Sequence, residues 1–132
     1  EKKVVIGFII GDMNGLKVIN DNYGHAEGDK LIKAAATVLF ENLHSAYGVY
    51  RIGGDEFAAI YISPDDDTVK KEMECVRTAC ENYKDSPIIL SIAMGYASGS
   101  YSPDYMDIYN GADGIMYEEK QLKKKLVLHM KI

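Results

Sequence analysis

The spacing of apolar and polar positions changes several times along the chain, and each change marks an expected element. Residues 4–10 are a continuous, β-branched apolar run that ends at Gly11 and Asp12, which predicts a central strand buried on both faces. Residues 14–24 are polar with a weak helical pattern. From Asp29 onward, helical spacing predicts an amphipathic helix whose apolar stripe is Leu31, Ile32, Ala35, Val38, Leu39 and Leu43.

A hairpin, a helix and a further strand are expected next. Residues 46–52 and 57–62 are strand-like runs on either side of a Gly-Gly turn, which predicts a β-hairpin. The apolar stripe of the following helix lies at Val69, Met73, Val76, Cys80 and Tyr83. Residues 87–97 predict another strand, residues 104–124 one or two short helices, and residues 126–132 a last strand.

This order of elements predicts the fold. It is β-α-β-β-α-β with an extra C-terminal helix and strand, which corresponds to a ferredoxin-like core of the α/β (α+β) class. Right-handed crossovers place the helices of such a core on one face of an antiparallel sheet. The first strand then lies beside the third and antiparallel to it, so its end meets the hairpin turn. We therefore expect Asp12 to lie next to Asp55 and Glu56.

Composition narrows the possible partners. The chain has 132 residues, of which 47% are hydrophobic, so we expect one domain with a single core. Its net charge of −5 does not provide the broad positive field that long nucleic acids or anionic membranes attract. No apolar stretch reaches membrane-spanning length and no signal peptide is visible, which predicts a cytoplasmic domain. Cys75 and Cys80 point in different directions on a helix and are expected to be reduced.

The three carboxylates expected at the hairpin turn suggest a chemistry. Carboxylates that are crowded together repel one another unless a cation or a proton lies between them. Asp12, Asp55 and Glu56 are hard oxygen ligands, which suit Mg²⁺ or Mn²⁺ better than zinc. Gly53 and Gly54 allow the backbone of the turn to approach a bulky ligand. A solvated turn that merely carries two acids is the alternative, and the pattern alone leaves it open.

A resemblance to a known family becomes specific at this turn. Residues 53–57 read Gly-Gly-Asp-Glu-Phe, which is the signature of the GGDEF family of diguanylate cyclases. Residues 12–29 resemble the family's D-x-D/N-x-(F/L)-K-x-x-N-D-x-x-G-H-x-x-G-D segment, residues 91–95 its S-I-G strand, and residues 112–120 its A-D-x-A-L-Y-x-A-K helix. The resemblance implies a nucleotide-cyclase or palm-like sheet, GTP as the substrate, and the conversion of two GTP molecules to cyclic di-GMP and two pyrophosphates.

The resemblance also implies roles for individual residues. Asp12 and Asp55 would coordinate Mg²⁺ or Mn²⁺ with the help of the Met13 carbonyl. Glu56 would be a further metal ligand or would help to deprotonate the attacking 3′-hydroxyl. The guanine edge would be read by Asn20 and Asp29, and the phosphates would contact Gly15, Leu16, Lys17, Lys120 and Lys124. The alternatives are ordinary ones: Asn20 as a helix cap, Asp29 as an acid in the first turn of a helix, and the lysines as a solvated helix end.

Four departures from the family pattern change what we expect of this chain. Asn14 stands where many members have a second aspartate, and Lys124 replaces the arginine of the usual G-R-N ending. His44 and Tyr47 occupy the positions of the R-x-x-D inhibitory motif, so no inhibitory site is expected. The family's preceding helix with its L-T-G-L-x-N-R segment is absent. We therefore expect residues 1–132 to be an N-terminally truncated output domain of a larger sensor protein, which could itself be anchored in a membrane.

The resemblance predicts a homodimer, because one domain binds one GTP and ring closure needs two domains. An upstream sensor or dimerisation domain is expected to bring the two copies together. Two other functions compete with cyclase activity. An inactive member would bind GTP or cyclic di-GMP as a regulatory module, although such members typically lose acids like Asp55. An RNA-binding sheet would need basic charge and exposed aromatic residues, and the first strand offers only Phe8.

Overall fold

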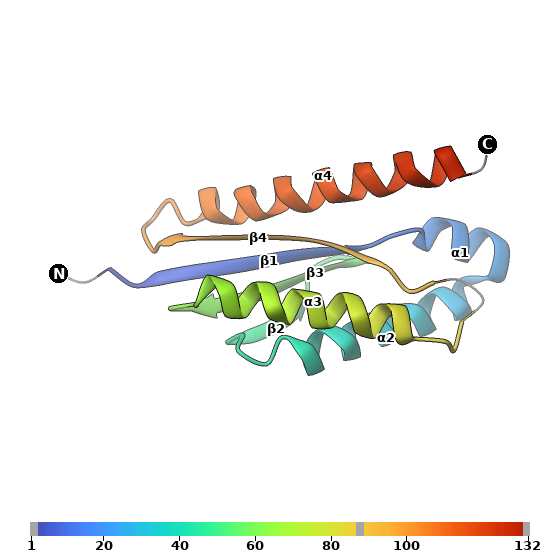
Figure 1. Cartoon of the computed structure of the whole chain (residues 1–132), viewed down its shortest axis with the longest axis horizontal. Coiled ribbons are helices and arrows are strands. Elements are labelled where there is room, and N and C mark those ends of the chain that lie inside the picture. Colours follow the sequence, from blue (N-terminus) through green and yellow to red (C-terminus); the bar gives the residue numbers. More distant parts are fainter. Residues whose placement is uncertain (1–2, 87–88, 131–132) are drawn as a thin grey trace.

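The computed structural model describes residues 3–86 and 89–130, with side chains described up to Lys123. Four strands and four helices follow one another in this part of the chain (Figure 1). In order they are β1 (Val5–Met13), α1 (Leu16–Tyr23), α2 (His25–Asn42), β2 (Gly48–Arg51), β3 (Glu56–Ile62), α3 (Asp66–Asn82), β4 (Ile92–Ser100) and α4 (Met106–Met130).

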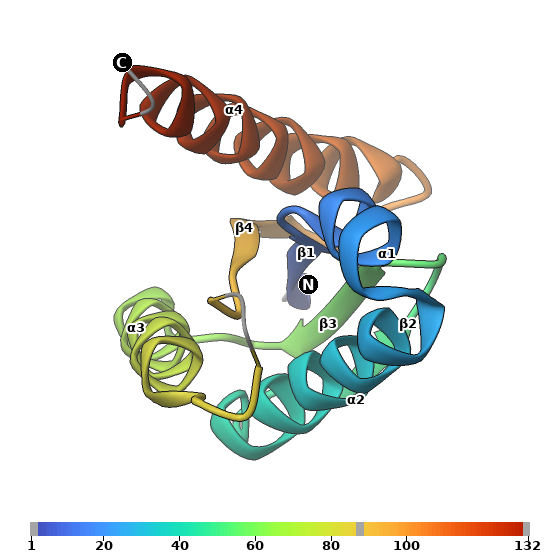
Figure 2. The same cartoon turned by 90° about the vertical axis from the view of Figure 1, so that its right-hand side faces the viewer.

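The sheet has the predicted ferredoxin-like topology. Its strand order is β2-β3-β1-β4, and each neighbouring pair is antiparallel. The two central strands, β1 and β3, pair over the whole length of β3, from Ile6 opposite Ile62 to Asp12 opposite Glu56. The expectation that β1 ends beside the hairpin turn is therefore confirmed. Helices α2 and α3 lie on one side of the sheet and α4 on the other (Figure 2).

Strand β1 is buried on both faces, as its unbroken apolar run predicted. Alternate side chains such as Ile9 and Met13 belong to the core beneath α2 and α3. Phe8 and Ile10 point to the opposite face and pack under α4. Phe8 also makes an edge-to-face contact with the Tyr109 ring of α4, with 5.6 Å between the ring centroids. The sheet is thus the middle layer between two separate apolar cores.

The predicted C-terminal strand over residues 126–132 is wrong. Residues 126–130 continue α4, so the one or two short helices expected over residues 104–124 are one helix of 25 residues. Short apolar runs fit a strand and a helix equally well, and extending an existing helix costs far less than starting a new element. Lys131 and Ile132 lie outside the described residues. No helix in the described part of the chain is both long and apolar enough to cross a membrane.

A single residue joins α1 to α2. Gly24 is the C-cap of α1 and the N-cap of α2, with φ 87° and ψ 163°. This backbone conformation is essentially restricted to glycine because a Cβ would clash with the neighbouring peptide groups. Helix α2 therefore begins at His25, four residues earlier than its apolar stripe indicated. The polar first turn of α2 contributes little to the core, and for that reason the apolar pattern did not reveal it.

Candidate functional site

The end of β1 and the turn between β2 and β3 meet at one end of the sheet. The backbone N–H of Met13 donates to the Asp55 carbonyl over 3.0 Å, and Asp12 lies directly opposite Glu56 in the strand register. Antiparallel pairing of the central strands thus gathers the three predicted carboxylates from positions more than forty residues apart. Asp12 and Glu56 lie on the face of the sheet that α4 covers, since they alternate with Met13 and Phe57 on the other face.

Helix α4 brings a cation to these acids. The Lys120 ammonium lies 2.8 Å from Asp12 Oδ1, and it donates a hydrogen bond of 3.1 Å to the Met13 carbonyl. The side chains of Lys120 and Asp12 are only 19% and 18% exposed. The predicted phosphate ligand Lys120 is therefore held against two predicted metal ligands. The side chain of Lys124 lies outside the described residues.

The carboxylates at this end of the sheet favour a bound cation. Burial is the main reason why the pKa of Asp12 is raised, and the neighbouring Asp55 carboxyl raises it further while Lys120 opposes the shift. Burial also raises the pKa of Glu56, followed by the charges of Asp113, Asp12 and Asp55. Each of these shifts reports negative charge that is crowded and partly shielded from water. Asp113, which α4 contributes, was given no role by the sequence.

A divalent cation fits the donor set of this site. No group of three or more His, Cys, Asp or Glu side chains in the described residues is arranged to enclose a metal. Mg²⁺, however, is usually held by one or two carboxylates and completes its shell with water and substrate phosphates. Asp12, Asp55 and the Met13 carbonyl form such an open set, and their oxygen atoms are the ligand type that Mg²⁺ and Mn²⁺ prefer.

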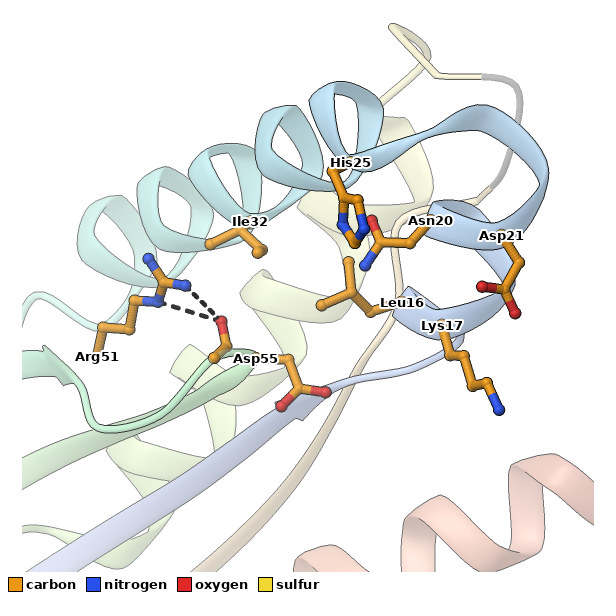
Figure 3. Close-up of a pocket in the computed structure, with 9 residues that line it drawn as sticks. Leu16, Lys17, Asn20, Asp21, His25, Ile32, Arg51 and Asp55 are labelled. Atoms are coloured by element: carbon orange, nitrogen blue, oxygen red, sulfur yellow. Dashed lines mark hydrogen bonds between the residues drawn. The ribbon is translucent and has the colours of Figure 1, made fainter.

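Arg51 fixes the backbone of the Gly-Gly turn. Its Nη2 and Nε donate to the Gly54 carbonyl over 2.7 and 3.2 Å (Figure 3). Its Nε also lies 3.1 Å from the Gly53 carbonyl. Because the guanidinium is planar and rigid, bonds to two successive carbonyls hold the turn in one conformation. Arg51 thereby positions Asp55, the next residue along the chain. Arg51 stands two residues before Gly53 in the sequence, and the sequence alone gave no reason for an arginine there.

An open cleft of about 490 Å³ lies between the turn, α1 and the start of α2 (Figure 3). It brings together several of the predicted site residues with others that the sequence analysis did not assign. The lining residues are Leu16, Lys17, Asn20, Asp21, His25, Ile32, Arg51, Gly54 and Asp55. The volume lies within the range of small-molecule sites in proteins. Asp55 of the hairpin turn, together with Lys17 and the Asn20 amide of α1, thus borders one hollow surface.

Asn20 presents an unpaired acceptor in this region. Its Oδ1 is buried and has no hydrogen-bond partner, and a Cβ at Gly28 would collide with it. Gly28 lies within α2 at an ordinary helical conformation, so close approach to Asn20 is what requires a glycine here. Asn20 lies inside α1 and its side chain does not cap the helix, so the helix-cap alternative is not formed.

Asp29 and Gly15, which were also predicted to bind the nucleotide, do not line the cleft. Asp29 is exposed on α2 and is not among the residues that line the cleft. It follows Gly28 directly, so its backbone lies next to the contact between α2 and Asn20.

Gly15 adopts φ 76° at the N-cap of α1, and no side chain caps this helix. The first N–H groups of α1, next to Leu16 and Lys17, therefore have no side-chain acceptor.

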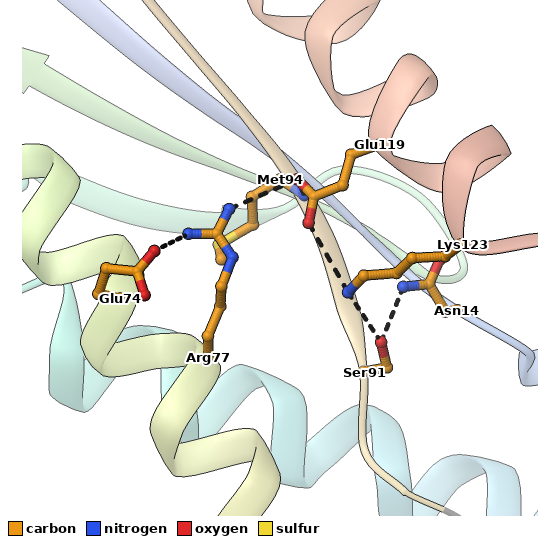
Figure 4. A network of polar contacts seen from close by, with 7 residues as sticks. All are labelled: Asn14, Glu74, Arg77, Ser91, Met94, Glu119 and Lys123. Carbon is orange, nitrogen blue, oxygen red and sulfur yellow. Dashed lines mark hydrogen bonds and ion pairs between the residues drawn. The ribbon is translucent and has the colours of Figure 1, made fainter. Parts of the chain in front are cut away.

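A network of polar contacts ties α4 to the loop after β1 (Figure 4). The Ser91 hydroxyl accepts hydrogen bonds from the Asn14 amide over 2.9 Å and from the Lys123 ammonium over 3.2 Å. One turn earlier on α4, Glu119 accepts from the Met94 backbone N–H over 3.2 Å and pairs with Arg77 of α3 over 3.5 Å. Asn14, which stands where many members of the resembled family have an aspartate, therefore donates a hydrogen bond to Ser91.

The comparisons with known proteins agree with the geometry. A family model described as "Diguanylate cyclase, GGDEF domain" matches residues 1–125. Diguanylate cyclase DosC of Escherichia coli K12 is 29% identical over 121 residues, which cover 88% of this chain and 26% of DosC. Diguanylate cyclase VdcA of Vibrio cholerae is 30% identical over 130 residues, which cover 93% of this chain and 38% of VdcA. The chain thus spans well under half the length of these relatives.

Solved structures show the same fold. The active GGEEF domain of a diguanylate cyclase from Vibrio cholerae superposes with a TM-score of 0.79 at 23% identity, covering 89% of this chain and 77% of that one. The GGDEF domain of DgcB from Caulobacter crescentus, in complex with c-di-GMP, gives a TM-score of 0.75 at 24% identity over 89% of this chain and 73% of that one. With a family match over nearly its whole length and the family's fold, the chain belongs to the GGDEF-domain family of diguanylate cyclases.

Proposed function

We propose that the domain joins two GTP molecules into cyclic di-GMP. In the first step, the 3′-hydroxyl of one GTP loses its proton and its oxygen attacks the α-phosphorus of the other; the bond from that phosphorus to the bridging oxygen breaks, and pyrophosphate leaves. The second step repeats this chemistry between the remaining 3′-hydroxyl and the remaining α-phosphorus, which closes the ring. The observation that carries the proposal is that Asp12 and Glu56 meet Asp55, which lines a nucleotide-sized cleft, in a GGDEF-family chain. All three acids are present, which favours catalysis over the inactive regulatory module.

The cleft and the elements around it offer contacts for each part of GTP. The unpaired Asn20 carboxamide can accept from the guanine N2 amine, and the Asp29 carboxylate suits N1–H and N2–H donors that adenine does not present in this pattern. The triphosphate would lie near the start of α1, where free N–H groups and Lys17 carry positive charge. Lys120 and Lys124 of α4 would neutralise the remaining phosphate charge.

Asp12, Asp55 and the Met13 carbonyl would hold Mg²⁺ or Mn²⁺, which supplies charge stabilisation to the reacting phosphate. Glu56 would be a further ligand or would receive the proton of the 3′-hydroxyl. Its raised pKa suits a proton acceptor, because burial and neighbouring acids make the carboxylate a stronger base than in water. The remaining catalytic effect would come from orienting two nucleotides in line.

Two copies of the domain are needed for the complete reaction. One cleft holds one GTP, and both 3′-oxygens must attack, so the two domains would face each other with two-fold symmetry. The relatives are much longer than this chain, which supports a role as the output domain of a larger sensor protein whose upstream part controls pairing. The free cysteines Cys75 and Cys80 are consistent with a cytoplasmic site of action.

Feedback inhibition through residues 44–47 is not expected in this chain. The His44 imidazole lies 3.4 Å from the carboxylate of Glu72, and the Tyr47 side chain is largely exposed. The segment offers neither a guanidinium nor a carboxylate to a bound cyclic dinucleotide. We therefore propose that cyclic di-GMP does not bind to residues 44–47.

The test is a turnover assay with a forced dimer. The domain would be fused to a parallel dimeric coiled coil, incubated with GTP and Mg²⁺, and its nucleotide products separated by chromatography. We expect cyclic di-GMP from the wild type and none from Asp55→Asn. Asp67→Asn, which alters an exposed acid on α3, is the matched control and should retain activity. GTP binding without product would favour the regulatory module, and failure to bind GTP would contradict both functions.

A further inference from the structure

The position of Lys120 conflicts with the metal-binding role of its neighbours. Its ammonium lies 2.8 Å from Asp12 Oδ1 and 3.1 Å from the Met13 carbonyl oxygen. These are two of the atoms that the proposed function assigns to a divalent cation. An ammonium offers up to three N–H donors, so one lysine can satisfy both oxygen atoms at once.

We propose that the Lys120 ammonium occupies the cation position in the nucleotide-free domain and must be displaced before a divalent metal binds there. The inference rests on the proposed function, because that function identifies the position as a metal site. Two cations cannot share it, since like charges in contact repel strongly in a partly buried environment. Removing the lysine without replacing it would leave Asp12 as an uncompensated carboxylate, which is costly in such an environment.

The surroundings of Lys120 allow the side chain to move while its backbone stays. Helix α4 is fixed against β4, because Gly95 lies in direct contact with the backbone of Ala112 and Met116. Lys120 follows this contact by one turn and reaches the acids through a flexible four-carbon stem. The exchange therefore requires only side-chain rotation, and an arriving triphosphate would offer the ammonium a new partner.

This arrangement couples the binding of metal to the binding of nucleotide. Without nucleotide, a metal ion must compete with an ammonium that is already in contact with the ligands. With nucleotide, the phosphates attract Lys120 and at the same time supply metal ligands. The domain would thus bind the metal weakly by itself and strongly together with GTP, so that Asp12 is never left unpaired during the exchange.

The test measures Mn²⁺ binding without nucleotide, using the electron paramagnetic resonance signal of free Mn²⁺. Lys120→Met and Lys120→Gln should each bind Mn²⁺ at least about tenfold more tightly than the wild type, because a competing charge is removed. Lys120→Arg keeps the charge and should not tighten binding. Lys71→Met, which alters an exposed lysine on α3, makes the same change in net charge and should match the wild type.

A second substitution identifies the site. Adding Asp12→Asn to Lys120→Met should abolish the gain in Mn²⁺ affinity. The inference is overturned if both neutral variants, shown to be folded by circular dichroism, bind Mn²⁺ no more tightly than the wild type. It is also overturned if the gain survives Asp12→Asn, because the metal then binds elsewhere.

The outcome is separable from that of the turnover assay. Wild-type synthesis of cyclic di-GMP with no gain in Mn²⁺ affinity for the Lys120 variants would remove the inference and leave the proposed function intact. An Asp12-dependent gain without any cyclic di-GMP synthesis would support competition between the lysine and the metal and would contradict the cyclase proposal.

Discussion

Gly95 of β4 lies so close to Ala112 of α4 that no side chain fits between the strand and the helix. A Cβ at Gly95 would collide with the Ala112 carbonyl and with the backbone N–H of Met116. Both obstacles are backbone atoms, which cannot rotate away as a side chain would. The contact therefore sets the distance between α4 and the sheet, and with it the reach of Lys120 toward Asp12.

Gly95→Ala should destabilise the domain by about 1–3 kcal/mol, because the helix must shift to relieve overpacking. The measurement is urea unfolding followed by circular dichroism. Gly114→Ala is the matched control, since a Cβ at this position of α4 would meet no atom within 4 Å beyond its neighbours and the backbone of its own helix, and it should stabilise by up to about 1 kcal/mol. Equal stability of the two variants would show that the contact is not tight.

Arg51 should be needed for turnover because it holds the Gly-Gly turn. Arg51→Met removes the hydrogen bonds to the Gly53 and Gly54 carbonyls, and loss of positioning should lower kcat/KM for GTP about tenfold or more. Arg51→Lys keeps the charge but not the planar fork, and it should restore only part of the activity. Full activity of Arg51→Lys would mean that charge, rather than the geometry of the guanidinium, is what the turn requires.

Tyr96 should make the domain less stable at high pH. Burial, followed by the hydrogen bond to Asp66, raises its pKa from 10.0 to about 12. Between these values the unfolded chain releases the phenolic proton while the folded chain retains it, so the free energy of unfolding falls as the pH rises. This contribution to stability is complete below about pH 10.

Urea unfolding at several pH values between 9 and about 12 would measure this slope. Tyr96→Phe should flatten part of it, whereas the exposed Tyr117→Phe serves as the matched control. An unchanged slope in Tyr96→Phe would show that this phenol does not contribute to the alkaline loss of stability.

The two cysteines should differ in reactivity. Cys75 is exposed, whereas Cys80 is buried and its pKa is raised to about 11, so little thiolate forms at neutral pH. A disulfide reagent such as DTNB at pH 8 should titrate one thiol rapidly in the folded chain and both in denaturant. Cys75→Ser should abolish the rapid phase, and a rapid phase that remains would contradict the burial of Cys80.

The sequence predicted the sheet well because its strands obey simple rules of pattern and connection. The apolar run of β1 and the Gly-Gly turn identified the central strands, and right-handed crossovers left one arrangement for them. The last strand failed because residues 126–130 carry an apolar run that is compatible with either element. The sequence around these residues did not indicate that they continue the preceding helix, α4.

The parts of the candidate site that strand pairing brings together could be predicted from the sequence. The contacts between side chains of α4 and the sheet could not. The juxtaposition of Asp12 with Glu56 follows from strand pairing. The contact between Lys120 and the Met13 carbonyl joins residues 107 positions apart, and it depends on how α4 lies over the sheet. The role of Ser91 as an acceptor for both Asn14 and Lys123 could not be predicted for the same reason. The catalytic and ligand roles of all the predicted site residues stay predictions.

The one-residue junction at Gly24 has a consequence for the proposed reading of the guanine base. Asn20 and Asp29 stand on two helices whose relative orientation depends on the two torsion angles of that residue. If the two residues read the guanine edge, as the proposed function requires, the torsion angles of Gly24 would set the distance between their side chains. In that case a substitution at Gly24 would leave both polar groups intact and still change which base is accepted, because selectivity would depend on the angle between two helices as much as on hydrogen-bond chemistry.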